Sequence, residues 1–323
     1  MSFQYLEWFK LEKMDIVEVA GLNKKFKNYP ALKNLTFSVN PGEIFGIIGP
    51  DGAGKTTLLR ILAGILSVES GTIKSCNVDV LKNPEGLRDK IGVVPQNFSL
   101  YPDLTVEENL NFFARMYGIS ENKSAQKKEQ LLNIMRLTPF LNRRAEHLSG
   151  GMQKKLAVIS SLLHNPLLLL LDEPTTGVDP VSRRELWDFF YELLKAGTTI
   201  IISTPYMDEA ERCSRVIFIH RGEILLIDEP DKMKSDYGYS ILAITGSDTN
   251  KINPALFPPE MAIIDIYPLG NTIHLITAKI AIERVLEFLH NTKLQLFAQR
   301  IDPTFEDVFI SLIRNKDEKY RSY

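Results

Sequence analysis

The segment that most restricts the fold of this chain is a glycine-rich loop, GPDGAGKTT, at residues 49–57. It fits the pattern G-x-x-x-x-G-K-[ST] and lies between the apolar run GEIFGIIG (42–49) and the helical pattern KTTLLRILAGIL (55–66). The backbone N–H groups of such a loop can surround phosphate oxygens, and the helix that follows adds about +0.5 charge at its N-terminus. This context favours a phosphate-binding loop over a glycine turn met by chance.

The side chains of this loop indicate a nucleoside triphosphate held with Mg²⁺. In such loops the lysine meets the β- and γ-phosphates and the following hydroxyl reaches the metal. The residues we expect at the nucleotide are Gly49, Pro50, Asp51, Gly52, Ala53, Gly54, Lys55, Thr56 and Thr57. A dinucleotide fingerprint does not fit, because Thr57 stands where that pattern needs its third glycine.

Around this loop, strand-like and helix-like segments alternate from residue 15 to about 235. Buried strands are predicted at 90–96, 167–172 and 198–204, with helices at 105–118 and 180–196 between them. Such alternation predicts right-handed βαβ crossovers and a mostly parallel sheet, hence an α/β fold. Residues 236–323 read as a small α+β domain, joined by the polar stretch DKMKSDYG (231–238).

Composition excludes several other classes of protein. The 323 residues fit roughly two domains. A net charge of −2 and a pI near 6.3 give no basic face for nucleic acid. No apolar stretch approaches the ~20 residues of a membrane span. The two cysteines, Cys76 and Cys213, match no metal-ligand spacing and suit a reducing cytosol.

Residues 1–14 form an extension that reads as an amphipathic helix or as an upstream start before Met14.

An acidic pair follows the strand LLLLL, at Asp172 and Glu173. There Asp172 can hold Mg²⁺ through water and Glu173 can act as general base on the attacking water, although acidic residues that only cap a strand are the alternative. The same tripeptide Asp-Glu-Pro recurs at Asp228 and Glu229. That second pair follows two short strands joined by a two-residue turn, so we expect an edge hairpin remote from the phosphate loop and a solvated role.

A second anion site is predicted in LSGGMQ (148–153), about 20 residues before the acidic pair. Ser149, Gly150 and Gly151 begin a helix and leave its first N–H groups exposed, and we include Gln153 among the nucleotide contacts. A chain with one nucleotide loop and two phosphate sites indicates that these sites meet across a dimer.

These motifs, in this order, resemble the ATP-binding cassette (ABC) ATPase family over about residues 15–235. The resemblance implies that Phe26 stacks on adenine, with Tyr29 as the alternative platform. It implies that Gln96 contacts Mg²⁺ and the membrane partner, and that Asp179 crosses the dimer interface. From the residues alone, the alternatives are that Phe26 is a core aromatic and that Gln96 is a plain loop residue.

The resemblance also implies a function. Residues of about 97–160 would form a helical arm that contacts a separate membrane permease. The segments NFSLYPDLTVEENLNFFARMYGI and SRRELWDFF, with the C-terminal DPTFEDVFISLI, look like the drug and antibiotic exporter branch. We therefore expect an ATP-hydrolysing subunit at the cytoplasmic face of a membrane, working as a homodimer or with a second ATPase. A soluble ABC ATPase and an ATP-sensing regulatory module are the competing interpretations.

One position departs from the family pattern. The segment STPYMDEA has Pro205 where the family has a histidine that contacts the γ-phosphate. Proline has neither a polar side chain nor an N–H, and losing one such donor typically costs about 10²–10³ in rate. Either Thr204 or Tyr206 substitutes, or a second ATPase brings an intact histidine.

Overall fold

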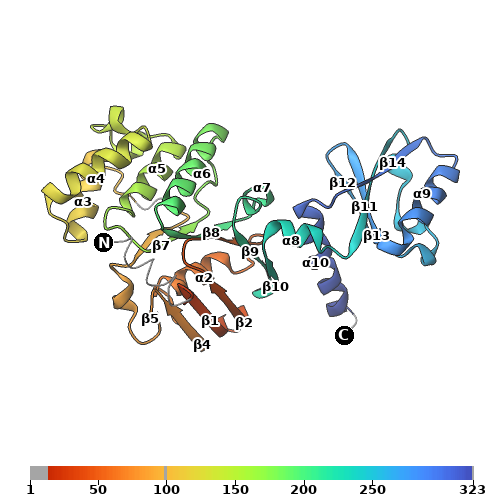
Figure 1. Ribbon diagram of the computed structural model, residues 1–323, viewed down its shortest axis with the longest axis horizontal. Coiled ribbons are helices and arrows are strands. Elements are labelled where there is room, and N and C mark those ends of the chain that lie inside the picture. The colour runs from red at the N-terminus through yellow and green to blue at the C-terminus, as the bar shows by residue number, and fades with distance from the viewer. Residues whose placement is uncertain (1–13, 98–99, 322–323) are drawn as a thin grey trace. The chain divides into compact units, whose positions relative to one another are not determined.

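The structure, a computed structural model, describes residues 14–97 and 100–321 (Figure 1). The chain divides after Ile227 into two compact units. The expectation for the helical character of residues 1–13 lies outside the described residues.

The centre of the first unit is a six-stranded sheet in the order β10-β9-β3-β8-β7-β6. Its strands are β3 (Ile44–Ile48), β6 (Ile91–Val94), β7 (Leu168–Asp172), β8 (Thr199–Thr204), β9 (Arg215–His220) and β10 (Glu223–Asp228). The pairs β3–β8, β3–β9, β6–β7 and β7–β8 are parallel, as predicted. Every residue of β3, β7 and β8 is buried, so both faces of this sheet are covered.

A second, antiparallel sheet packs over the helix that follows the phosphate loop. It has the order β2-β1-β4-β5. Its strands are β1 (Val17–Phe26), β2 (Tyr29–Val39), β4 (Ser70–Ser75) and β5 (Val78–Asp79), and the helix is α2 (Lys55–Leu62). Leu58 and Leu62 of α2 share one apolar core with Phe45 of β3 and Leu35 of β2, so α2 is held between the two sheets (Figure 1).

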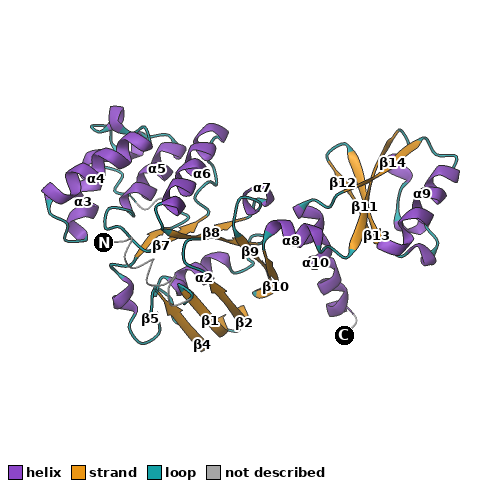
Figure 2. Ribbon diagram, in the orientation of Figure 1, coloured by secondary structure: helices purple, strands orange, loops and turns teal. Residues whose placement is uncertain are grey.

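Helices gather on the other side of the six-stranded sheet (Figure 2). They are α3 (Val106–Met116), α4 (Glu121–Ile134), α5 (Gly150–Ser160), α6 (Pro180–Lys195) and the short α7 (Met207–Ala210). The predicted capping box opens α3: the Glu108 N–H donates to Thr105 Oγ1 at 3.2 Å, and the Thr105 N–H donates to Glu108 Oε2 at 2.8 Å. Helices α3 to α5 lie within residues 97–160, the segment predicted to form the helical arm.

The second unit contains a four-stranded antiparallel sheet in the order β12-β13-β11-β14. Its elements are α8 (Pro230–Ser235), β11 (Tyr239–Gly246), β12 (Ile263–Leu269), β13 (Thr272–Ala278), α9 (Ile282–Asn291), β14 (Leu296–Ile301) and α10 (Phe305–Arg321). Val285 and Leu289 of α9 pack on Leu242 and Leu275 of the sheet. The stretch expected as a linker instead forms α8, which contacts α10, and the division therefore falls earlier than residue 235.

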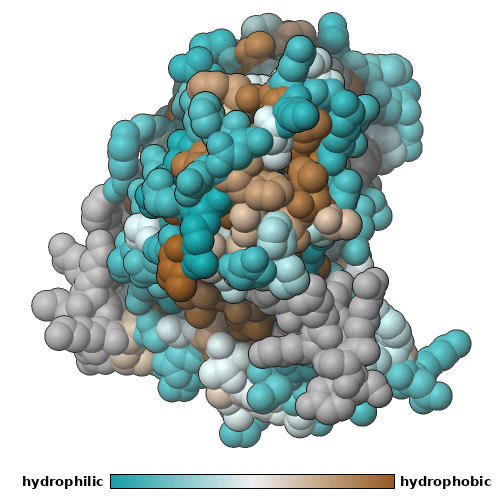
Figure 3. Space-filling model, turned by 90° about the vertical axis from the view of Figure 1, so that its right-hand side faces the viewer, coloured by the Kyte–Doolittle hydropathy of each residue, from teal (hydrophilic) through white to brown (hydrophobic). Residues whose placement is uncertain are grey.

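Within the described residues, no helix combines the length and the apolar character that a bilayer crossing needs. In the space-filling view, apolar side chains form brown patches among teal polar ones (Figure 3). Both cysteines are buried. Burial raises the pKa of Cys76 to about 12, so this thiol stays protonated near neutral pH.

Candidate functional site

The phosphate loop joins β3 to α2, and two of its glycines are required by close backbone contacts. A Cβ on Gly49 would lie 2.2 Å from the carbonyl oxygen of Ile219, and a Cβ on Gly54 would lie 2.9 Å from that of Ala31. Gly54 is the N-cap of α2 with a φ of 112°, in the region that favours glycine. The loop is thus curled between neighbouring strands, with the N-terminus of α2 directly behind it.

Lys55 is the only loop side chain that is buried and charged among those described, at 4% exposure. Its Nζ donates to the carbonyl oxygens of Gly49 at 2.8 Å and Pro50 at 3.2 Å. The same atom lies 3.2 Å from Glu173 Oε1. The predicted phosphate-binding lysine and the predicted general base are therefore in contact.

Two of the three predicted metal side chains, Thr56 and Asp172, meet, whereas the third, Gln96, contacts Glu173. Thr56 Oγ1 donates to Asp172 Oδ1 at 3.1 Å, and Ser203 Oγ donates to the same oxygen at 2.6 Å. Ser203 was not found from the sequence, because its place depends on the pairing of β7 with β8, which sets it opposite Asp172. Hydroxyl and carboxylate oxygens are ligands that suit Mg²⁺, which takes few protein ligands and keeps waters and phosphates. The donor set therefore fits Mg²⁺, although the described residues contain no cluster of three or more metal-ligating side chains of the His, Cys, Asp and Glu type.

Glu173 is held from several sides. Its Oε2 accepts from Gln96 Nε2 at 2.9 Å and from Thr176 Oγ1 at 3.3 Å. Its backbone N–H donates to Ser203 Oγ at 3.0 Å, and its φ is 47°, unusual for a residue with a side chain. Such backbone strain persists only where the surroundings fix it, and it is concentrated at functional sites.

The second anion site lies at the start of α5. Ser149 is exposed and is the N-cap, with its Oγ accepting from the Met152 N–H at 3.3 Å. A Cβ on Gly151 would lie 2.7 Å from Ser182 Oγ and 3.1 Å from Asp179 Oδ2, so this glycine packs against the start of α6. The roles of Ser149, Gly150 and Gly151 at a nucleotide remain predictions. Gln153 donates its side-chain amide to the Ala145 carbonyl at 3.0 Å, which fixes it to the arm.

Asp179 is the N-cap of α6. Its Oδ1 accepts from the N–H groups of Val181 at 3.1 Å and Ser182 at 2.9 Å. The backbone hydrogen bond from Ser182 holds the pKa of this carboxyl below its usual range. Its predicted place across a dimer interface stays a prediction.

The segment around Pro205 is held by a buried glutamate, Glu209, whose role was not predicted from the sequence. Glu209 has no exposed surface. Its Oε1 accepts from Arg183 Nε at 2.6 Å and Trp187 Nε1 at 3.2 Å, and its Oε2 accepts from Thr204 Oγ1 at 2.7 Å. A threonine hydroxyl has a single proton, and the proton of Thr204 is already donated to Glu209, which argues against Thr204 as the substitute for a histidine.

The two candidate adenine platforms are neighbours at the hairpin between β1 and β2. Phe26 and Tyr29 are directly paired, so they share one face of the ribbon. They are 46% and 64% exposed, which makes Phe26 a surface side chain rather than a core aromatic. Both remain predictions for the base contact.

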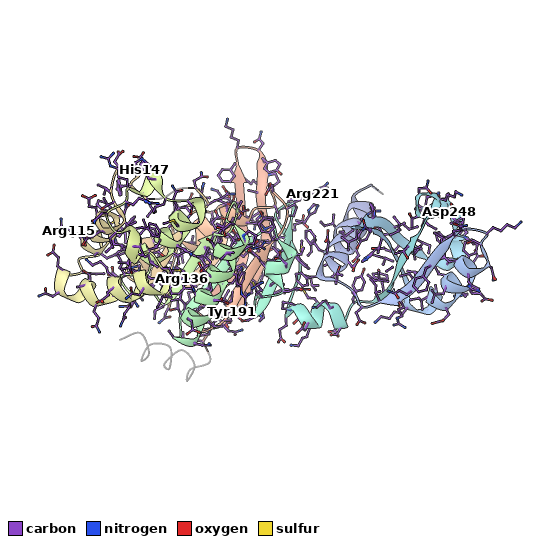
Figure 4. All side chains as sticks on the ribbon, turned by 90° about the horizontal axis from the view of Figure 1, so that it is seen from above. Arg115, Arg136, His147, Tyr191, Arg221 and Asp248 are labelled. Atoms are coloured by element: carbon purple, nitrogen blue, oxygen red, sulfur yellow. The ribbon has the colours of Figure 1, made fainter. Side chains whose placement is uncertain are left out.

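The hairpin of β9 and β10 corrects one expectation. It is an edge hairpin with the two-residue turn Arg221-Gly222, labelled at Arg221 in Figure 4, but it is not remote from the phosphate loop. The Gly222 N–H donates to the Ala53 carbonyl at 3.0 Å, and the Gly222 carbonyl accepts from the Lys33 N–H at 2.7 Å. Sequence spacing could not show this, because it depends on β9 being the neighbour of β3.

The second Asp-Glu-Pro lies at the other end of β10. Asp228 ends that strand and Glu229 is the N-cap of α8. Lys232 Nζ lies 2.6 Å from Glu229 Oε1 and 4.0 Å from Asp228 Oδ1, on the surface. The repeated tripeptide is therefore a surface ion-pair cluster at a helix start.

Substituting Gly222 with alanine is expected to destabilise the first unit. The residue has a φ of 78°, and an added Cβ would lie 2.4 Å from the Ala31 carbonyl oxygen. Strain and clash together should lower the free energy of unfolding by about 1–3 kcal/mol, measured by urea denaturation. Gly118→Ala is the matched control, because Gly118 has a φ of 67° but no atom within 4 Å of an added Cβ. Equal losses in the two variants would contradict the close contact as the cause.

Taken together, the loop, the strand carboxylates and the parallel sheet define a P-loop nucleotide-binding protein. The family model described as "ABC transporter" matches residues 32–176. The chain belongs to the ABC transporter family and is an ATP-binding cassette of that family, as the following relatives show.

Two kinds of curated relatives are similar to this chain. One is the "Probable multidrug ABC transporter ATP-binding protein YbhF" of Escherichia coli K12, 38% identical over 303 residues, covering 92% of this chain and 52% of the relative. This chain thus spans about half the length of that relative. Another is the "Nod factor export ATP-binding protein I" of Paraburkholderia xenovorans LB400, 38% identical over 244 residues, covering 75% of this chain and 80% of the relative.

Solved structures agree. An "ATP binding subunit of ABC transporter" superposes with a TM-score of 0.64 at 30% identity, covering 69% of this chain and 93% of that one. The ATP-binding cassette MJ0796, in a dimeric post-hydrolysis state bound to ADP and Pi, gives a TM-score of 0.62 at 27% identity, covering 66% and 98%. The predicted family and α/β P-loop fold are confirmed.

Proposed function

We propose that this chain is the ATP-hydrolysing subunit of an exporter, driving a separate membrane permease from the cytoplasmic face. The observation that carries the hydrolytic part is the placement of Glu173, whose carboxylate lies between Lys55 Nζ at 3.2 Å and Gln96 Nε2 at 2.9 Å. A carboxylate so placed beside a phosphate-binding lysine can accept the proton of an attacking water. The exporter part is supported by relatives named for multidrug and Nod factor export.

In the proposed cycle, two chains hold two ATPs between them. The loop at 49–57 of one chain binds the triphosphate, and Ser149 to Gly151 of the partner covers the γ-phosphate with exposed helix N–H groups. The dimeric post-hydrolysis state of MJ0796 supports a dimer in this cycle. Hydrolysis then removes the bridging phosphate, and the dimer reopens.

Mg²⁺ is part of the proposal. Thr56, Asp172 and Gln96 would hold it, directly or through water, and when bound it would neutralise charge on the β- and γ-phosphates. Ser203, which donates to Asp172 Oδ1 at 2.6 Å, would orient that carboxylate.

A groove in the first unit supports a membrane partner. It has a volume of about 490 Å³ and is lined by the end of α2, by the segment 84–88, by β6 and by Tyr117 at the end of α3. It therefore lies at the junction of the core sheet and the helical arm, where a protruding element of a permease could reach both.

Purifying the tagged chain from membranes tests for a membrane partner. A polytopic protein should accompany the chain, and a second ATPase as well if the dimer is heteromeric. Recovery of the chain with no membrane protein would favour the soluble or ATP-sensing alternatives.

We expect the residue at position 205 to limit the rate of ATP hydrolysis. We predict that Pro205→His raises steady-state ATP turnover of the purified homodimer by about 10²-fold, because it restores one donor at the position after β8. Pro205→Ala is the control, since it removes the proline ring without adding a side-chain donor. If the wild-type homodimer already turns over briskly in a Glu173-dependent way, no second ATPase is required and Tyr206 becomes the substitute to test. If the histidine and alanine variants behave alike, the loss at Pro205 is not what limits hydrolysis.

A further inference from the structure

A lysine on α5 is bound to the loop that holds the predicted base. Lys154 Nζ donates to the backbone carbonyl of Gln96 at 2.7 Å. The side chain of Gln96 in turn donates to Glu173 Oε2 at 2.9 Å. Two successive hydrogen bonds thus join α5 to the Glu173 carboxylate of the same chain.

The charge of Lys154 also acts on this site. The side chain is half-buried, and burial lowers its pKa, while the negative charges of Asp172 and Glu173 act in the opposite direction. Its ammonium group is therefore within electrostatic reach of both carboxylates. Screening by salt is weak for partly buried groups, so this interaction persists at physiological ionic strength.

A small cavity adjoins the contact. Its volume is about 110 Å³, and its lining comes from three segments: Pro95 and Asn97 beside Gln96, Lys154 on α5, and Gly177 in the turn before Asp179. The loop around Gln96 is thus not packed tightly against α5, and the Lys154 hydrogen bond is a specific link between them. Loss of that link leaves room for the loop to shift.

The same helix begins at the second anion site. Ser149 is the N-cap of α5, and Lys154 lies within its first turns. A rigid helix can transmit a displacement at one end to the other, and energetic coupling between distant sites can be carried by such an element.

We propose that Lys154 is a positioning residue that couples the two ATP sites of the dimer. Ser149 at the start of α5 meets the nucleotide bound to the partner chain, while Lys154 on the same helix holds the Gln96 loop and so aligns Glu173 at its own chain's nucleotide. This inference rests on the proposed dimeric ATPase, since it needs two nucleotides in one dimer.

Kinetics of Lys154→Met and Lys154→Arg test the positioning role. The methionine variant should lower kcat by about 10-fold to 100-fold, the usual cost of losing a supporting hydrogen bond or of a small misplacement. Its ATP dissociation constant and melting temperature should stay as in the wild type, because the phosphate loop is untouched. Arginine keeps a donor and should restore most of the rate. Lys195→Met, at a lysine that is 72% exposed on α6, should leave kcat unchanged.

A double-mutant cycle with Gln96→Ala separates this route from a general effect. Because Lys154 acts through the Gln96 side chain, Lys154→Met should add nothing to the loss already caused by Gln96→Ala. Additive losses in the double variant would overturn the positioning role. Unchanged kcat in Lys154→Met would do the same.

Cooperativity tests the coupling. Two linked sites allow a Hill coefficient for ATP hydrolysis between 1 and about 2. We expect a value above 1 in the wild-type chain and near 1 in Lys154→Met. A coefficient near 1 in the wild type, or one retained in Lys154→Met, would overturn the coupling. Absence of any Glu173-dependent hydrolysis, even with Pro205→His, would instead refute the proposed function itself, so the two failures are distinguishable.

Discussion

Glu173→Gln is expected to reduce ATP hydrolysis by about 10²-fold to 10⁴-fold while ATP remains bound, because a neutral amide cannot accept the proton of the attacking water. Glutamine has nearly the same shape, so the hydrogen bond from Thr176 and the contact with Lys55 can persist without disturbing the loop. Steady-state phosphate release and nucleotide titration measure the two effects separately.

The same variant should accumulate as an ATP-bound dimer, since the phosphate that bridges two chains is no longer removed. Size-exclusion chromatography with and without ATP measures this. The chain supplies its own matched control in Glu229, which occupies the same place in the second Asp-Glu-Pro and is paired on the surface with Lys232 at 2.6 Å. Glu229→Gln should keep both the rate and the monomer–dimer balance of the wild type. Unchanged hydrolysis in Glu173→Gln would refute its assignment as base.

Lys55→Ala should weaken ATP binding by about 10²-fold to 10³-fold, the loss expected when one partner of a buried charge pair is truncated. The side chain is 4% exposed and already points along the inner side of the loop, where it donates to the carbonyl oxygens of Gly49 and Pro50. Its removal also leaves the charge of Glu173 without its cation. Titration with a fluorescent ATP analogue measures the dissociation constant.

A loss of folded protein would imitate a loss of binding, so a second buried lysine serves as control. Lys155 is 6% exposed and pairs with Glu185 away from the phosphate loop. Lys155→Ala should lower the melting temperature yet leave the ATP dissociation constant of the folded protein unchanged. If both variants lose affinity to the same extent, the effect of Lys55→Ala comes from stability rather than from phosphate contact.

The sequence predicted those parts of the site that local patterns determine. The loop at 49–57 was readable because its glycines, lysine and threonine are consecutive and stand between a strand and a helix. The start of α6 at Pro180 was predicted for the same reason, since a first-turn proline acts within a few residues. The acidic pair at Asp172 and Glu173 was readable because it directly follows a continuous apolar run of strand length.

The parts that escaped prediction depend on which strands are neighbours. Ser203 reaches Asp172 only because β8 lies beside β7, and Gly222 reaches the phosphate loop only because β9 lies beside β3. The pairing of Arg183 with Glu209 joins α6 to α7 across the intervening strand β8, a contact that no periodicity of the sequence predicts. Non-local contacts of this kind follow from the strand order, which the pattern of apolar residues alone does not give.

The position of β10 has a practical consequence for anyone shortening this chain. The start of β10 follows the turn that is hydrogen-bonded to the phosphate loop. The last residue of β10, Asp228, is the first residue of the second unit. A protein trimmed to the catalytic cassette must therefore retain the whole of β10, because a cut a few residues earlier would unravel the edge strand that backs the loop. A stand-alone cassette should therefore end directly after Asp228, which keeps that edge intact and leaves α8 with α10 in the second unit.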